Sequence, residues 1–247
     1  MNDSVFETVE KSSQILKLDF SSVEFAKLAE EQELTEAQIQ AVGMVFEHLQ
    51  RKKIETTIQT LLKMSRLPLK DPKTFDNFDF SVIKGRDAAK LKTLPSLSAI
   101  YAHRNLAFIG PAGTGKTHLA QAFGYECCQR GIKTYFIKMS ELRDKFTAAR
   151  RAGKEASVLD GLVRPSCLII DEVGHCEFDK ENTRLFFDLI DRRYNKEGNF
   201  NIVFTSNKHP SHWRTNFNED AVALFMTHKS GAKRRLLAYI TFKRILS

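Results

Sequence analysis

Apolar side chains recur at helical spacing in the amino-terminal part of the chain. The positions that share this spacing are Ile39, Val42, Phe46, Leu49, Ile54, Ile58, Leu61 and Leu62. The pattern predicts one long amphipathic helix, with Gly43 as the point where it would break. Capping-box spacings at Ser21-x-x-Glu24 and Thr35-x-x-Gln38 indicate helix starts upstream. We therefore expect residues 1–67 to form a helical domain.

A different pattern begins after residue 67. The segment PLKDPKTFDNFDFS, residues 68–81, contains two prolines and three phenylalanines and has no helical period. Proline interrupts helices, and such a segment is typical of a connection between folded parts. We interpret residues 68–82 as a linker whose phenylalanines dock on the domain that follows.

Short apolar runs alternate with helical stretches in residues 83–247. The strand candidates are Leu106–Ile109, Thr134–Ile137, Cys167–Ile170 and Ile202–Thr205, and the helix candidates lie near residues 116–130, 140–152 and 180–195. Strands that alternate with helices in this way form a parallel sheet covered by those helices. The sequence therefore predicts an α/β domain over residues 83–247, with helices on both faces of a parallel sheet.

The net charge of +8 is distributed unevenly along the chain. Residues 1–50 hold 3 basic and 10 acidic side chains, a net charge of −7, whereas residues 51–247 hold 35 basic and 20 acidic ones, a net charge of +15. A basic domain attracts polyanions, of which nucleic acid is the usual one. Solvated lysine and arginine faces produce the same surplus, so the charge alone leaves both interpretations open.

Apolar runs, the first residues of the chain and the cysteine spacing indicate the cellular compartment of the protein. The longest uninterrupted apolar run, Ala221–Met226, has six residues, whereas a membrane helix needs about 20. The chain starts with acidic residues where a signal peptide has basic ones. The four cysteines, Cys127, Cys128, Cys167 and Cys176, form no C-x-x-C pair, which disfavours a disulfide framework or a zinc site. We expect a soluble, cytoplasmic protein without a membrane partner.

A phosphate-binding motif, G-x-x-x-x-G-K-[ST], occurs in full between a predicted strand and a predicted helix. Its residues are Gly110, Pro111, Ala112, Gly113, Thr114, Gly115, Lys116 and Thr117. The glycines let successive N–H groups face a phosphate at the positive end of the helix dipole. Lys116 would reach the β- and γ-phosphates of ATP, and the Thr117 hydroxyl would ligate Mg²⁺. The alternative is a glycine turn without a ligand, but such a turn needs neither the lysine nor the threonine.

Two adjacent carboxylates, Asp171 and Glu172, follow the predicted strand at Cys167–Ile170. Behind a phosphate loop, Asp171 would hold Mg²⁺ and Glu172 would orient and polarise the attacking water. The alternative is a buried strand that merely ends in acids. A kinase that transfers phosphate to a small molecule does not need the second acid, so Glu172 favours hydrolysis.

An amide side chain follows the last predicted strand. Ser206-Asn207 would reach the same edge of the sheet as the two carboxylates, because ligands of parallel sheets bind at the carboxyl ends of the strands. Asn207 would sense the γ-phosphate or help to place the water, although Ser-Asn alone is only a turn signal. We interpret His118 and His175, which flank the motifs, as polar neighbours, because phosphoryl transfer depends mainly on positioning.

Positive side chains gather between the second and third predicted strands. They are Lys138, Arg143, Lys145, Arg150, Arg151 and Lys154. Such a helix can bind the DNA backbone without reading bases, in a salt-sensitive manner. The alternative is a solvated helix face. A second basic group on the long amino-terminal helix allows the same two interpretations; its members are Arg51, Lys52, Lys53, Lys63 and Arg66.

The surrounding sequence resembles a known family. The resemblance spans roughly residues 20–217 and is strongest in the runs GPAGTGKTHLAQAFGYECCQRGIKTYFIKMSELRDKF, PSCLIIDEVGHCEFD, LFFDLIDRRYNKEGN and NIVFTSNKHPSHW. These runs are similar to the IstB family of insertion-sequence helper ATPases, whose relatives include the DnaC-type helicase loaders. The resemblance implies an AAA+ P-loop NTPase in which residues 110–117 are the Walker A loop, Asp171 and Glu172 the Walker B pair, and Asn207 sensor 1.

The same resemblance implies a function. The protein would assemble as a homo-oligomer on duplex DNA with ATP, with little sequence preference, deform the DNA and recruit or activate a transposase. ATP hydrolysis would control disassembly. A DnaC-type helicase loader that grips single-stranded DNA keeps the fold and is an alternative. Two further alternatives are a small-molecule kinase and a nucleotide-binding switch without hydrolysis.

The tail departs from the family pattern from about residue 218. An AAA+ protein of this kind needs an arginine finger for the γ-phosphate of the neighbouring subunit, and usually a sensor 2 arginine. Arg234, Arg235 and Arg244 are available, but nothing around them assigns these roles. An altered or out-of-frame ending is one hypothesis. It would leave ATP binding intact and weaken hydrolysis that a neighbouring subunit activates.

Overall fold

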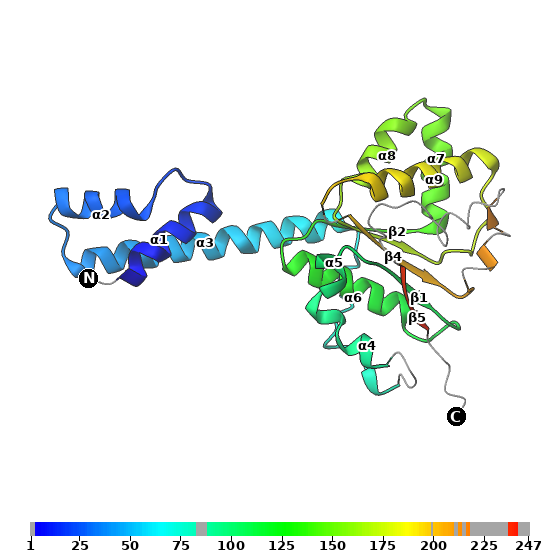
Figure 1. Cartoon of the computed structure of the whole chain (residues 1–247), viewed down its shortest axis with the longest axis horizontal. Coiled ribbons are helices and arrows are strands. Elements are labelled where there is room, and N and C mark those ends of the chain that lie inside the picture. The colour runs from blue at the N-terminus through cyan, green and yellow to red at the C-terminus, as the bar shows by residue number, and fades with distance from the viewer. Residues whose placement is uncertain are drawn as a thin grey trace. The chain divides into compact units, whose positions relative to one another are not determined.

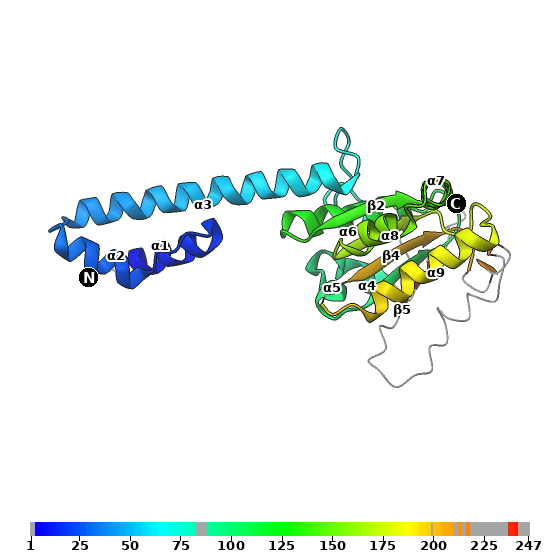
Figure 2. The same ribbon diagram turned by 90° about the horizontal axis from the view of Figure 1, so that it is seen from above.

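The computed structural model describes residues 3–82, 88–198, 200–209, 212–213, 216–217 and 237–241. The chain divides into two compact units, residues 1–60 and residues 61–247. Each unit has its own hydrophobic cluster. Figures 1 and 2 show the helices and strands of both units in two views.

The first unit is helical. It contains α1 (Asp3–Leu16), α2 (Ser22–Glu31) and the greater part of α3 (Glu36–Ser65). Its core is built on Val5, Val9 and Phe25, and the Phe25 ring lies 5.1 Å from the Phe6 ring and 6.0 Å from the Phe20 ring, between centroids. The three helices therefore share one small aromatic core.

Local signals in the sequence position the ends of these helices. Both capping boxes are confirmed: Ser21 and Glu24 bond each other's backbone N–H groups, and so do Thr35 and Gln38. The break predicted at Gly43 is wrong, because α3 runs through this position. A Cβ atom at Gly43 would lie 2.7 Å from Val5 Cγ1, so the glycine permits α1 to approach α3 closely.

The last turn of α3 belongs to the second unit. The helix stops at Ser65, and Arg66 takes the left-handed conformation with φ 61°. The Arg66 guanidinium lies 2.9 Å from the Glu141 carboxylate and donates to the Tyr135 hydroxyl at 3.3 Å. Arg66 therefore anchors the helix end. Because it follows α3 and is paired in this way, it does not belong to the basic group that the sequence suggested on this helix.

The second unit is built on a parallel sheet. Its strands are β1 (Asn105–Ile109), β2 (Thr134–Lys138), β3 (Cys167–Asp171), β4 (Asn201–Ser206) and β5 (Leu237–Thr241), in the order β2-β3-β4-β1-β5. The first four match the predicted strands to within one residue at either end. The fifth lies in the atypical tail and pairs with β1 in parallel. Part of that tail therefore completes the sheet.

Helices cover both faces of the sheet, as predicted (Figure 1). On one face, α6 (Lys116–Gln129) packs against β2, β3 and β4. On the other lie α7 (Met139–Arg151), α8 (Glu155–Val163) and α9 (Lys180–Asn195), whose apolar side chains join one core with those of the strands. The sequence pattern did not predict α8, which follows a turn at Gly153 with φ 61°.

Shorter helical segments precede the sheet. They are the 3₁₀ turns Phe80–Val82 and Leu94–Ser96 and the helices α4 (Ala88–Lys92) and α5 (Ser98–Tyr101). Among the helices of the described residues, none combines the length and apolar character that crossing a bilayer requires. The four cysteines are free thiols. Burial raises the pKa of Cys128 to about 11, so this thiol stays protonated and unreactive at neutral pH.

A buried arginine ties the helices to the strands. The Arg193 side chain in α9 is fully buried, and its guanidinium donates to five carbonyl oxygens at 2.7–3.4 Å. The carbonyls belong to Leu162, Val163, Pro165, Ser166 and Asn201. Arg193 thus holds the end of α8, the turn before β3 and the start of β4 together.

We expect Arg193→Leu to lower the free energy of unfolding by about 3 kcal/mol or more, because buried carbonyls would lose their donors. Arg192 is the matched control: its side chain is 41% exposed and pairs with Asp188 and Asp160 in solvent. Arg192→Leu should therefore cost less than about 1 kcal/mol. Urea denaturation followed by circular dichroism measures both variants. Equal losses would contradict the anchoring role of Arg193.

Candidate functional site

The loop between β1 and α6 has the backbone that the phosphate motif requires. Gly113 and Gly115 have φ angles of 77° and 84°, which side chains other than glycine rarely adopt. The Gly110 N–H donates to the Ser206 carbonyl at 3.2 Å, which joins the loop to the end of β4. α6 begins at Lys116, so the amino end of the helix points into the loop.

The linker phenylalanines pack against this loop. The Phe78 ring contacts the His118 ring edge-on, with 5.1 Å between centroids, and a Cβ atom at Gly115 would lie 2.6 Å from Phe78 Cε2. The Phe80 ring packs on Phe78 at 5.0 Å. His118 Nε2 lies 3.0 Å from the Thr74 carbonyl. The docking expected of the linker is confirmed, and His118 serves it as a polar neighbour.

Lys116 is held inside the loop. Its side chain is only 6% exposed, and its ammonium donates to the Pro111 carbonyl at 2.6 Å and to Thr114 Oγ1 at 3.4 Å. Burial lowers the pKa of Lys116, and the negative charge of Asp171 partly offsets this effect. A buried ammonium with few acceptors favours an anionic ligand.

The Asp171 carboxylate lies directly behind the loop and is 1% exposed. Its Oδ1 accepts hydrogen bonds from the Thr117 hydroxyl, at 2.9 Å, and from the Thr205 hydroxyl. Its Oδ2 is buried and has no hydrogen-bond partner among the described residues. Burial raises the pKa of this carboxyl, and the two hydroxyls partly oppose the shift. A buried carboxylate oxygen next to a hydroxyl matches the oxygen ligands that Mg²⁺ prefers.

Glu172 has an unusual backbone. It is a non-glycine residue in the left-handed region, with φ 61°, and its N–H donates to Thr205 Oγ1 at 2.9 Å. Backbone strain of this kind persists where the surrounding structure enforces it, often at functional sites. The Glu172 carboxylate lies 3.5 Å from the Lys138 ammonium. Thr205 therefore positions both acidic residues.

Thr205 is the functional candidate that the sequence did not reveal. Within a strand it looks like an ordinary β-branched residue, and only the pairing of β3 with β4 brings its hydroxyl to Asp171. Asn207 follows β4 and is exposed. Because β4 lies between β3 and β1, Asn207 lies at the strand end between the acidic pair and the phosphate loop.

The predicted basic segment does not form one free surface. Lys138 ends β2 and pairs with Glu172, and Arg143 bonds to Asp144 at 2.9 Å. Arg150 is an internal tie: its guanidinium lies 2.9 Å from Asp179, 3.5 Å from Glu181 and 3.2 Å from Asn182.

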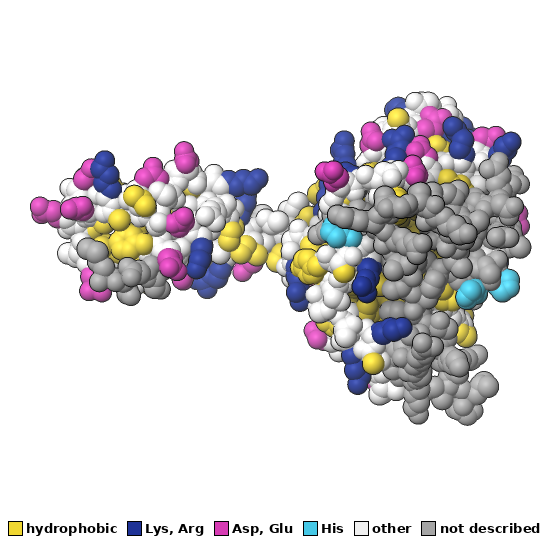
Figure 3. Space-filling model, viewed as in Figure 1, with side chains coloured by type: hydrophobic (Ala, Val, Ile, Leu, Met, Phe, Trp, Pro, Cys, Tyr) yellow, Lys and Arg dark blue, Asp and Glu magenta, His cyan; other side chains and the backbone are white. Residues whose placement is uncertain are grey.

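The other members of the basic segment face solvent to different degrees. Lys145 is half-buried, whereas Arg151 and Lys154 are exposed around the turn between α7 and α8. Figure 3 shows basic and acidic side chains interspersed on the visible face of this unit. Arg234, Arg235 and Arg244 of the tail lie outside the described residues.

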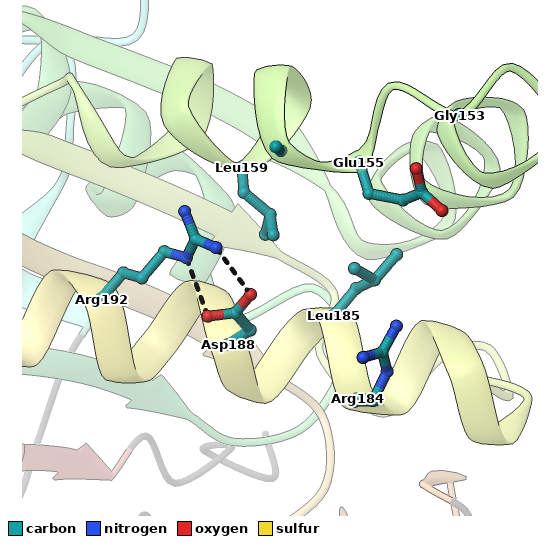
Figure 4. Close-up of a pocket in the computed structure, with 8 residues that line it drawn as sticks. Gly153, Glu155, Leu159, Arg184, Leu185, Asp188 and Arg192 are labelled. Atoms are coloured by element: carbon teal, nitrogen blue, oxygen red, sulfur yellow. Dashed lines mark hydrogen bonds and ion pairs between the residues drawn. The ribbon is translucent and has the colours of Figure 1, made fainter.

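A shallow groove of about 480 Å³ lies between α8 and α9 (Figure 4). Its lining residues are Gly153, Glu155, Ala156, Leu159, Arg184, Leu185, Asp188 and Arg192. The Arg192 guanidinium donates to the Asp188 carboxylate at 2.8 Å, as the figure shows. None of the predicted site residues lines this groove. The groove is therefore distinct from the candidate site, which consists of the phosphate loop and its acidic neighbours.

Comparison with known proteins shows the family to which the chain belongs. Residues 11–229 match the family model described as IstB-like ATP binding protein. The match therefore extends past residue 217, where we expected the resemblance to end. A protein of insertion sequence IS5376 from Geobacillus stearothermophilus, named for ATP binding, is 41% identical over 157 residues, which are 64% of this chain and 61% of that protein. The corresponding IS21 protein of Pseudomonas aeruginosa is 32% identical over 166 residues, 67% of this chain and 61% of that protein.

The chain thus spans about 61% of the length of these two relatives. Solved structures support the AAA+ fold. AMPPCP-bound DnaA from Aquifex aeolicus has a TM-score of 0.57 at 20% identity, over 71% of this chain and 51% of that one. A DnaC helicase loader has a TM-score of 0.55 at 19% identity, over 69% of this chain and 97% of that one. The chain is a member of the IstB-like ATP-binding family of insertion-sequence proteins.

Proposed function

We propose that this protein is an ATP-hydrolysing, DNA-binding helper of transposition, which assembles on duplex DNA, deforms it and recruits or activates a transposase. The observation that carries the proposal is the buried Asp171 carboxylate beside Thr117, with its Oδ2 unpartnered behind the phosphate loop. A buried charge without a partner is costly, and a bound cation removes that cost. Membership of the family supplies the context of an insertion sequence.

ATP is the substrate that this geometry fits. The N–H groups of residues 110–117 would cradle its phosphates, and Lys116 would exchange the Pro111 carbonyl for the β- and γ-phosphates. Thr117 and Asp171 would hold Mg²⁺, which neutralises phosphate charge when bound. The pairing of a hydroxyl with a buried carboxylate supports this assignment.

Glu172 and Asn207 would position the attacking water. The water oxygen bonds to the γ-phosphorus as the bond to the ADP oxygen breaks, and the Glu172 carboxylate accepts the proton of the water. Thr205 holds the Glu172 backbone, so β4 sets where this carboxylate can reach. ATP hydrolysis would control disassembly from DNA.

The basic character of the chain supports DNA as a partner. Residues 51–247 carry a net charge of +15, with 35 basic and 20 acidic side chains, and Arg151 and Lys154 are exposed. Such cations bind the phosphate backbone of DNA without reading bases. A homo-oligomer would complete the site, because an arginine from a neighbouring subunit stabilises the charge that develops on the γ-phosphate.

A helicase loader that grips single-stranded DNA is the second candidate. Its support is the similarity of the fold to a DnaC helicase loader and to a DnaA structure described as bound to AMPPCP and single-stranded DNA. Competition between duplex and single-stranded DNA, with pull-down against a transposase and a replicative helicase, distinguishes the two candidates.

We expect the purified protein to hydrolyse ATP, and to do so faster with duplex DNA than without it. Glu172→Gln should lower kcat about a hundredfold or more and leave ATP binding intact, because an amide cannot accept the proton of the water. Phosphate release with and without DNA, together with nucleotide affinity, measures both effects. The variant should also accumulate in ATP-bound assemblies on DNA.

Lys116→Ala is the binding control and should abolish both ATP affinity and assembly. Wild-type hydrolysis rates in Glu172→Gln would refute the role assigned to Glu172. Phosphate transfer to a small-molecule acceptor, independent of DNA, would indicate a kinase. If the wild type assembled on DNA only with bound ATP but did not hydrolyse it, the protein would be a nucleotide-binding switch without hydrolysis.

Thr205→Val should keep the shape of β4 and remove the hydroxyl that contacts Asp171 and the Glu172 N–H. We expect kcat to fall about tenfold or more, as is usual when a group that orients metal ligands is removed. Thr205→Ser retains an Oγ atom and should keep most of the activity. Steady-state kinetics at several Mg²⁺ concentrations measure the difference. Similar rates in the two variants would show that the hydroxyl is dispensable.

A further inference from the structure

A buried tryptophan holds the turn that carries Asn207. Trp213, the only tryptophan of the chain, is 1% exposed, and its ring packs against the Phe204 ring of β4 at 5.8 Å between centroids. Its indole N–H donates to Ser206 Oγ at 3.0 Å and to the Lys208 carbonyl at 3.1 Å. The two acceptors belong to the residues on either side of Asn207, so a single donor fixes both ends of this turn.

The Ser206 hydroxyl uses its full capacity for hydrogen bonds. A serine hydroxyl has one donor and two acceptor positions. Ser206 Oγ accepts from the Trp213 N–H and, also at 3.0 Å, from the Lys208 backbone N–H. It donates to the Val173 carbonyl at 2.6 Å. Because the Ser206 side chain is buried, water does not replace a bond that is lost there, and removal of the indole N–H leaves one acceptor position empty.

The segment that Ser206 joins to this turn is fixed separately. The Glu172 N–H donates to Thr205 Oγ1 at 2.9 Å, and the Val173 N–H donates to the Thr205 carbonyl at 2.8 Å. The acidic pair therefore has its own support from β4. The bonds of Trp213 and Ser206 set the position of Asn207 relative to that fixed segment.

Packing alone does not require a tryptophan at position 213. The same hydrophobic core contains several buried phenylalanines, among them Phe178, Phe186 and Phe217, whose rings lie 5.0–5.9 Å apart between centroids. A phenylalanine fills such a position without burying a polar atom. Trp213 differs from these residues by its N–H, which needs an acceptor when buried, and both acceptors lie in the turn around Asn207.

We infer that Trp213 is a positioning residue for ATP hydrolysis and that it acts through Asn207. By holding Ser206 and Lys208, its N–H sets where the Asn207 amide meets the γ-phosphate and the attacking water. This inference rests on the proposed function, since it assigns a supporting residue to the same site. Loss of the N–H should lower kcat and leave ADP affinity unchanged, because ADP lacks the phosphate that Asn207 would contact.

Trp213→Phe in the full chain keeps an aromatic ring and removes the N–H. We expect kcat with duplex DNA to fall about tenfold, since small misplacements of a reacting group are costly. Replacement of the single tryptophan by benzothienylalanine, which has a similar shape but sulfur in place of the N–H, should cause the same loss. Fluorotryptophan, which keeps the N–H, should retain wild-type kcat. Phe217→Leu is the matched packing control and should keep most of the activity, because this buried side chain has no polar donor.

Asn207→Ala separates positioning from a general loss of structure. If Trp213 acts through Asn207, Trp213→Phe lowers kcat no further in the Asn207→Ala background, whereas independent effects multiply. Multiplied losses overturn the inference, and so does wild-type kcat in the benzothienylalanine protein, which decides the matter if Trp213→Phe fails to fold. Absence of ATP hydrolysis by the wild type with DNA would overturn the proposed function itself, and the inference with it.

Discussion

The candidate site depends on one buried carboxylate. Burying the charge of Asp171 costs free energy, and the hydroxyls of Thr117 and Thr205 offset only part of it, because both bind the same oxygen. Thr117 comes from α6 and Thr205 from β4, so three elements must be in place for these two bonds to form. The position of the strands and the chemistry of the site therefore rest on the same contacts.

Lys116 carries the complementary charge under the same constraint. Burial lowers the pKa of this lysine and raises the pKa of Asp171, so each group loses some of its preference for the charged form. The electrostatic interaction between them opposes the shift at Lys116. A phosphate at Lys116 and a cation at Asp171 would relieve both penalties. The burial of these two groups thus supports the proposed binding of a polyphosphate together with a metal ion.

The parallel sheet makes neighbours of side chains that are far apart in the sequence. The carboxyl ends of β2, β3, β4 and β1 lie along one edge, so the residues that end or follow these strands gather there. Lys138 reaches Glu172 for this reason, although 34 positions separate them in the numbering. The same edge brings the first residue of the basic segment next to the acidic pair of the candidate site.

Features that depend on short-range interactions could be predicted from the sequence. The phosphate loop is one, because left-handed glycines, a helix start and a lysine suffice to specify it locally. The capping boxes and the first four strands are others, since each follows from side chains a few positions apart. Membership of the family and the Asp171-Glu172 pair were evident for the same reason.

Only the tertiary structure decided which distant side chains meet. Thr205 became a candidate because the β3–β4 register brings its hydroxyl to Asp171. Gly43 proved to be a contact for α1 and not a helix break, and Arg150 proved to be an internal tie. In each case a local pattern allowed more than one partner, and long-range packing selected one. The sequence by itself therefore determined the phosphate loop and the first four strands, whereas the parallel order of the strands determined which acidic and basic groups contact each other.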